Sequence, residues 1–197
     1  MPWYLYVIIP LAAIALIVAA IVIRTAVLRS KNIYLHRKVT ARLKGYARLR
    51  GFKVLTNVRL TYKGGEKLVS HVLVGIFGIL LVDVHELAGD LYGTADDKKW
   101  TYVPKKGKRQ QLDSLTLDLQ AKAEAVRELL GTHKLYRMTI DSINVVQNGE
   151  KRLVLYVPES LPLIRVRKLS AFLNKVKYDT DAGVDMEKIA AILTEGK

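Results

Sequence analysis

The sequence predicts an α+β domain, in a three-layer α/β arrangement, that follows one transmembrane helix. Three observations predict it. Residues 3–23 form an apolar run without charge. Between residues 52 and 85, three strand-like segments follow one another across glycine-containing turns. A helical pattern over 115–130 is then followed by a further strand-like segment at 139–146. Elements in this order pack as layers around one core.

The apolar run has the length of a membrane span. Its 21 residues would form a helix about 30 Å long, the thickness of a bilayer's hydrocarbon core. Basic residues follow the run rather than precede it, which argues against a cleaved signal peptide. By the positive-inside rule the N-terminus lies outside the cell. We therefore expect a single-pass anchor in the cell membrane at residues 1–30 and a cytoplasmic domain at 31–197.

Charge is unevenly distributed along the chain. The first acidic residue is Glu66, and twelve of the 32 Lys and Arg residues precede it, whereas the other twenty share the rest of the chain with all eighteen acids. Such an asymmetry indicates a polyanionic partner, either lipid headgroups or nucleic acid. The absence of cysteine excludes a disulfide framework and a thiolate zinc site. The predicted binding residues are Arg37, Lys38, Arg42, Lys44, Arg48 and Arg50.

The elements near the anchor follow from hydrophobic spacing and turn residues. Val39, Leu43 and Tyr46 recur at helical spacing, which predicts a basic helix over 24–50 that Gly51 ends. The apolar stretch 79–82 has no alternation and is typical of a central strand buried on both faces. The predicted strands are 52–62, 66–75 and 78–85, with a turn at 63–65 between the first two.

The second half predicts a hairpin, a helix, two strands and two more helices. Asp113 or Ser114 caps the helix, whose apolar face includes Leu115 and Leu119, and Gly131 ends it. The predicted ranges are a hairpin at 89–104, a basic loop at 105–109, strands at 139–146 and 152–157 about a turn at 147–150, and helices at 164–176 and 185–193.

A polar cluster ends the third predicted strand. Asp83 and His85 share one face of that strand, and Glu86 points to the other. On the preceding strand, Glu66 has the parity of Ser70 but lies ~13 Å away along the strand, too far to share a metal ion with it. A Ser70–His85–Asp83 triad is disfavoured because no nucleophile elbow surrounds Ser70.

A family resemblance rests on these segments. In order and spacing they resemble the nuclease-related domain (NERD), whose pattern runs Ile-Asp-His-Val-Val-Val, Gly-Ile-Phe-Val-Ile-Glu-Val-Lys, Gly-x-Ile-x-Gly and a Trp. The resemblance covers about residues 37–160, and it implies a restriction-endonuclease-like αβββαβ core of the PD-(D/E)XK kind. The segments that carry it are Ser70-His71-Val72-Leu73-Val74-Gly75, Gly78-Ile79-Leu80-Leu81-Val82-Asp83-Val84-His85 and Gly89-Asp90-Leu91-Tyr92-Gly93, followed by Trp100.

The active-site positions that the resemblance implies are Ser70, Asp83, His85 and Gln120, and they depart from the family pattern. Ser70 stands where the family has Asp, Asp83 where it has Glu, and His85 where it has Lys. In the helix, Gln120 alone matches the family's Asn-Pro-x-x-Gln. Magnesium-assisted cleavage usually needs two carboxylates, and Asp83 alone is a weak metal ligand.

We therefore expect a membrane-anchored, catalytically degenerate nuclease-related domain that acts as a binding or scaffold module, with nucleic acid as one candidate ligand and no cofactor. One alternative is an active Mg²⁺-dependent nuclease with an altered site. Another is a structural subunit whose anchor contacts other membrane proteins, since small residues recur at four-residue spacing in the apolar run.

Overall fold

The computed structural model describes residues 16–17, 33–105, 107–146 and 153–195. The predicted anchor, apart from residues 16–17, and the predicted turn at 147–150 lie outside these residues. Among the helices that the structure describes, none combines the length and apolar character of a membrane span.

The central sheet has five strands in the order β1-β2-β3-β7-β9. Strands β1, β2 and β3 pair antiparallel with one another, and β7 then pairs parallel with both β3 and β9. The predicted strands 52–62, 66–75, 78–85 and 139–146 and the turn at 63–65 are confirmed, with ends shifted by no more than one residue, whereas β9 was not predicted. The strands are β1 (Lys53–Tyr62), β2 (Gly65–Gly75), β3 (Gly78–His85), β7 (Ile140–Val146) and β9 (Leu163–Arg165).

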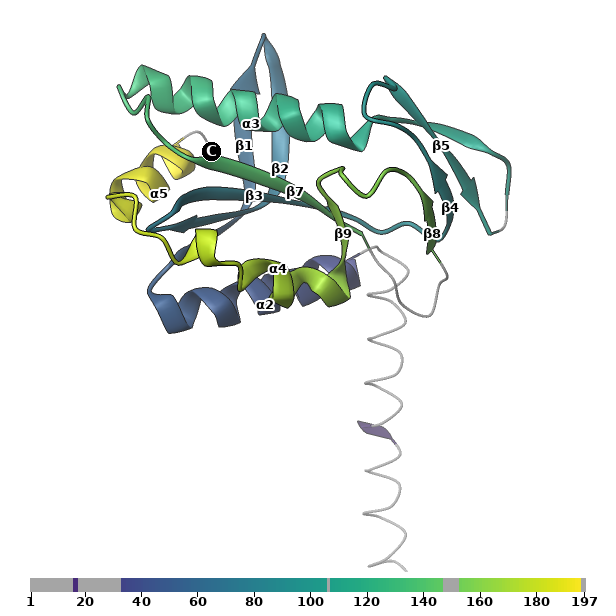
Figure 1. The fold of residues 1–197 in the computed structure, drawn as a ribbon, viewed down its shortest axis with the longest axis horizontal. Helices are drawn as coiled ribbons and strands as arrows, with labels where there is room; N and C mark the ends of the chain where they lie inside the picture. The colour runs from purple at the N-terminus through teal and green to yellow at the C-terminus, as the bar shows by residue number, and fades with distance from the viewer. Residues whose placement is uncertain (1–15, 18–32, 106, 147–152, 196–197) are drawn as a thin grey trace, which may run out of the picture.

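Helices cover both faces of this sheet (Figure 1). The helices α2 (Ile33–Arg50) and α4 (Leu169–Leu173) lie on one face, and α3 (Leu115–Thr132) and α5 (Met186–Glu195) on the other. The order α2-β1-β2-β3-α3-β7 and the three layers confirm the predicted α+β arrangement.

The two helical layers exist because β3 is apolar on both sides. Leu80, Val82 and Val84 pack with α2 and α4, whereas Ile79 and Leu81 pack with α3 and α5. Alternating side chains of one strand point to opposite faces, so an apolar residue at nearly every position requires cover on both. The first seven residues of β3 are buried, as expected for a central strand.

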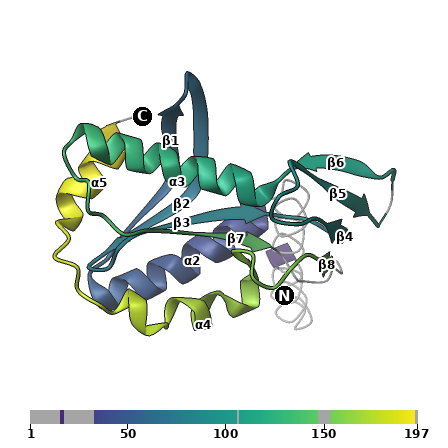
Figure 2. The same ribbon diagram turned by 45° about the horizontal axis from the view of Figure 1, so that its top comes forward.

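A second sheet extends beside the first (Figure 2). Its strand order is β6-β5-β4-β8, and its inner face packs around the fully buried Trp100. The hairpin β4-β5 was predicted, but β6 was not. The strands flanking the predicted turn at 147–150 lie in different sheets, since β7 pairs with β3 and β8 with β4. The strands are β4 (Gly89–Tyr92), β5 (Lys99–Pro104), β6 (Gln110–Asp113) and β8 (Leu153–Tyr156).

Two local predictions were wrong. The segment predicted as one helix at 164–176 begins as strand β9, and short 3₁₀ turns at Val166–Lys168 and Val176–Tyr178 flank α4. Helix α3 continues through Gly131, and Lys134 takes the left-handed conformation after it, with φ +60°. Helix α2 is described only from residue 33, and Gly51, with φ +69°, follows its end as predicted.

The hairpin β1-β2 bends at Asn57. That residue has φ +53°, in the left-handed region that most residues avoid. The hairpin keeps its register, but Val69 and Val72, which differ in parity, both pack in the cluster under α3. Beyond the bend, simple alternation therefore no longer tells which side chains face α3.

Candidate functional site

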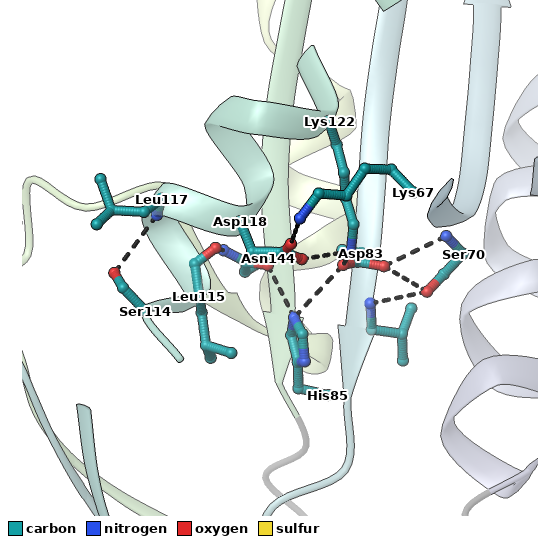
Figure 3. A network of polar contacts seen from close by, with 11 residues as sticks. Lys67, Ser70, Asp83, His85, Ser114, Leu115, Leu117, Asp118, Lys122 and Asn144 are labelled. Carbon is teal, nitrogen blue, oxygen red and sulfur yellow. Dashed lines mark hydrogen bonds and ion pairs between the residues drawn. The ribbon is translucent and has the colours of Figure 1, made fainter. Parts of the chain in front are cut away.

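Three polar residues stand in one row across the central sheet, facing α3. Asp83 on β3 is paired with Asn144 on β7. On the other side, Ser70 of β2 follows directly after the pair His71–Val82, which places it opposite Asp83. All three residues are buried. The register of the sheet, rather than proximity in sequence, brings them together (Figure 3).

Ser70 satisfies one oxygen of the Asp83 carboxylate. Its hydroxyl donates to Asp83 Oδ1 at 2.5 Å, and its backbone N–H donates to the same oxygen at 3.2 Å. The hydroxyl oxygen in turn accepts from the Val84 N–H at 3.3 Å. Ser70 is therefore a hydrogen-bond partner of the carboxylate and holds it in place.

Lys122 satisfies the other oxygen. Its ammonium donates to Asp83 Oδ2 and also lies 2.6 Å from Asp118 Oδ2, one helical turn earlier on α3. Lys67 reaches Asp118 Oδ1 at 2.8 Å from β2. The side chains of Asp83 and Lys122 are only 6% and 9% exposed, whereas those of Asp118 and Lys67 are about one third exposed. The four groups form a chain of two carboxylates and two ammonium groups.

Helix α3 positions Lys122 and Asp118 above the strand. The Ser114 hydroxyl accepts from the Leu117 N–H at 3.4 Å and so fixes where the helix begins. Leu119 and Val126 on the same side of the helix are buried. Lys122 lies between them on this stripe and therefore points to the sheet.

Asp83 and Lys122 each stabilise the charged form of the other. Burial alone would raise the pKa of Asp83, but the nearby Lys122 and His85 and the hydrogen bonds from Lys122 and Ser70 outweigh it, so the pKa lies below its ordinary value. Burial alone would lower the pKa of Lys122, but Asp83 and Asp118 raise it above its ordinary value. At neutral pH the carboxylate and the ammonium are both charged.

His85 is held by Asn144. The Asn144 side chain donates through Nδ2 to the Leu115 carbonyl at 3.0 Å, so its Oδ1 faces His85 and accepts from Nε2 at 2.9 Å. The same ring nitrogen lies 3.7 Å from Asp83 Oδ2. Because Nε2 carries the proton in this arrangement, it has no lone pair to offer a metal ion.

The structure brings together three of the four family positions. Ser70, Asp83 and His85 meet, but Gln120 is exposed, because two residues along a helix turn it roughly 200° away from Lys122. The structure therefore does not bring Gln120 together with the other three positions. Glu66 pairs with Arg59 at 3.4 Å and is exposed.

His71 faces the opposite layer, as its parity predicts, where its ring stacks on His36 and its Nε2 contacts Thr40. The predicted binding residues all lie on α2. Of these, Arg42 donates to the Val166 carbonyl and Arg50 pairs with Asp179, whereas the other four are exposed.

Sequence reasoning missed Lys122, Asp118, Lys67 and Asn144. The signal for Lys122 was a lysine on the buried stripe of a helix, at the spacing Leu115, Leu119, Lys122, Val126. A charge at such a position requires a partner. The Asp118–Lys122 spacing of four residues was a second signal.

These residues do not fit a divalent metal ion. Two ammonium groups already supply the two positive charges that Mg²⁺ would bring to Asp83 and Asp118. Asp83, Ser70 and Lys122 are each less than a tenth exposed, so a phosphodiester cannot touch them in this arrangement. Among the described residues, no group of three or more His, Asp or Glu side chains is arranged to hold a metal ion. The site as it stands is an electroneutral network that fixes α3 on the sheet.

Comparison with known proteins places the chain in a family. A family model described as nuclease-related domain (NERD) matches residues 31–147, more than half of the chain. The protein therefore belongs to the nuclease-related domain family, as the resemblance of residues 70–100 predicted. No curated protein and no solved structure matches the chain.

Proposed function

We propose that this protein is a membrane-tethered nuclease-related domain that has lost metal-dependent cleavage and acts as a binding module. The inference that cleavage is lost rests on one observation, the ion pair between Lys122 and Asp83. It puts a protein cation on the one carboxylate that matches the family's active site. The αβββαβ order of elements resembles the restriction-endonuclease-like core, which supports the view that this site derives from a nuclease active site.

The tether and the binding role rest on the sequence and on α2. The uncharged run at 3–23 and the basic residues that follow it support a single-pass anchor with the domain on the cytoplasmic side. Helix α2 has no acidic residue and presents Arg37, Lys44 and Arg48 on one exposed stripe, opposite its buried stripe. Such a surface suits an anionic partner.

A second candidate function has one observation in its favour. Asp118 is a second carboxylate close to Asp83, since Lys122 contacts both. If Lys122 moved aside, the two carboxylates would resemble a metal site, with a lysine beside them to stabilise charge. This arrangement would be an active nuclease whose second acid and lysine come from α3.

A cleavage assay separates the two functions. The full chain in detergent is incubated with single- and double-stranded DNA in Mg²⁺ or Mn²⁺. We expect product formation equal to that of the Asp83→Asn variant, because Asp83 is held by Lys122 and Ser70 and is not free to bind metal. The matched control is Glu187→Gln, which removes a carboxylate on α5. Cleavage that Asp83→Asn abolishes and Glu187→Gln preserves would replace the proposal with the active nuclease.

A further inference from the structure

One layer of the molecule combines the basic helix α2 with the basic C-terminal segment 166–178. Residues 33–50 and 166–178 together contain ten Lys and Arg residues and no Asp or Glu. The two segments pack together through Leu35, Val39 and Leu43 of α2 and Leu169 and Leu173 of α4. Figures 1 and 2 show α2 and α4 side by side under the sheet.

The exposed cations of α2 point away from the sheet. Helix α2 buries the stripe that contains Leu35, Val39 and Leu43, so the stripe with Arg37, Lys44 and Arg48 faces outward. The second segment adds exposed cations. These are Arg167, Lys168, Lys175 and Lys177, the last of which also pairs with Asp141.

On the opposite layer, formed by α3 and α5, acidic residues outnumber basic residues. Helix α3 has three acids against two basic residues, and α5 has two against one. Of the twelve Lys and Arg residues that precede Glu66, six lie on α2 and therefore on this face of the fold.

Two exposed aliphatic side chains lie within this basic layer. Leu49 is 83% exposed and Val176 is 82% exposed, higher fractions than those of the other exposed large hydrophobic residues that the structure describes. Each has a basic residue on both sides, as Arg48-Leu49-Arg50 and Lys175-Val176-Lys177. Arg50 pairs with Asp179 at 3.0 Å, which joins the end of α2 to the segment that carries Val176.

We infer that the α2/α4 layer is a docking face for an anionic phospholipid bilayer, with Leu49 and Val176 entering the interface between headgroups and acyl chains. Cations attract the anionic surface, and apolar side chains among them enter the lipid, which is the division of roles in interfacial membrane binding. Nucleic acid would explain the cations but offers little to exposed aliphatic groups. Only nine residues separate the apolar run from Ile33, a reach of at most about 30 Å for an extended chain.

This inference deepens the proposed function and rests on its tethered binding role. It adds the second basic segment, the two apolar contacts and the orientation of the domain. The face that carries α2 and α4 lies on the bilayer, and α3 with the Asp83 network faces away from it.

Fluorescent labels on the full chain test the orientation. Because the chain has no cysteine, the single variants Leu49→Cys and Val176→Cys can each carry one polarity-sensitive label, and Leu117→Cys on α3 is the matched control. Each is assembled into nanodiscs of phosphatidylcholine alone or with 30% phosphatidylserine. We expect emission from positions 49 and 176 to shift to shorter wavelength in the anionic discs and to revert in high salt, with position 117 unchanged.

Variants that remove cations test how much the basic residues contribute to docking. A cation near an anionic surface contributes about fivefold to binding. Changing Arg37, Lys44 and Arg48 together to Gln should thus lower the docked-to-undocked ratio about a hundredfold. The same change at Arg127, Arg137 and Lys188, which are exposed outside this layer, should leave the ratio within about twofold.

Two outcomes would refute the docking face, and a third would refute the tether without bearing on the docking face. Labels at 49 and 176 that behave like the label at 117 in anionic discs would refute the docking face. So would a response to an added oligonucleotide with none to phosphatidylserine, which would assign the layer to nucleic acid. A chain that does not copurify with phosphatidylcholine discs would count against the tether alone, because labels report docking to anionic discs whether or not the anchor inserts.

Discussion

The Lys122→Met variant should lower the free energy of unfolding by about 3 to 5 kcal/mol at neutral pH, the usual cost of removing one partner of a buried ion pair. Methionine matches the length of lysine but leaves Asp83, whose side chain is 6% exposed, without a cation. Asp118 keeps Lys67 and is partly solvated, so most of the loss comes from Asp83. Urea unfolding followed by circular dichroism measures it.

The double variant Asp83→Asn/Lys122→Met controls for packing. It removes both charges, preserves an oxygen that accepts from Ser70, and leaves the Asp118–Lys67 pair intact. Its unfolding free energy should therefore lie within about 2 kcal/mol of the wild-type value, because a neutral replacement of a buried pair costs far less than a broken one. If the double variant were as unstable as Lys122→Met, the loss would reflect the shape of residue 122 and not an uncompensated charge.

The wild-type protein should lose about 3 kcal/mol of unfolding free energy as pH falls from about 6.5 to 4 because of His71. Burial, with a further contribution from His36, lowers the pKa of His71 from 6.5 to about 4. Over this range the unfolded chain binds a proton that folded His71 does not, so acid favours unfolding. Below this range, Asp83 and Asp118 add to the loss, because their lowered pKa values make their stabilising charge disappear as they protonate.

The variant His71→Phe isolates the histidine. Phenylalanine fills a similar volume, and the Thr40 hydroxyl still donates to the His36 carbonyl. Urea midpoints of the two proteins measured between pH 4 and 7 should be closest near pH 7 and separate toward pH 4, where the wild-type protein loses stability that the variant keeps, so the profile of the variant is much flatter. Parallel profiles would show that His71 is not the group that titrates.

Most helices and strands could be predicted from the sequence because each depends on patterns among neighbouring residues. The apolar stretch 79–82, the turn at 63–65 and the cap at Ser114 each depend on a few neighbouring residues, and each was predicted. The short strand β9 was missed because three residues are too few to show a period of two, and its place in the sheet depends on pairing with β7.

The site was only half predictable, for physical reasons that differ between residues. Ser70, Asp83 and His85 lie on two adjacent strands, so alternation along the strands and one turn bring them together. Lys122 is 39 residues from Asp83, and only the docking of α3 makes them neighbours. Lys67 reaches Asp118 past the bend at Asn57, where the simple parity rule fails.

The most direct test of the central claim is anomalous scattering from a crystal of the wild-type protein soaked in Mn²⁺. We expect Lys122 Nζ to remain bound to Asp83 and Asp118, with no anomalous peak within coordination distance of either carboxylate. An ordered Mn²⁺ bound by Asp83 and Asp118, with the lysine displaced, would contradict the account and identify the network as a closed form of a working metal site.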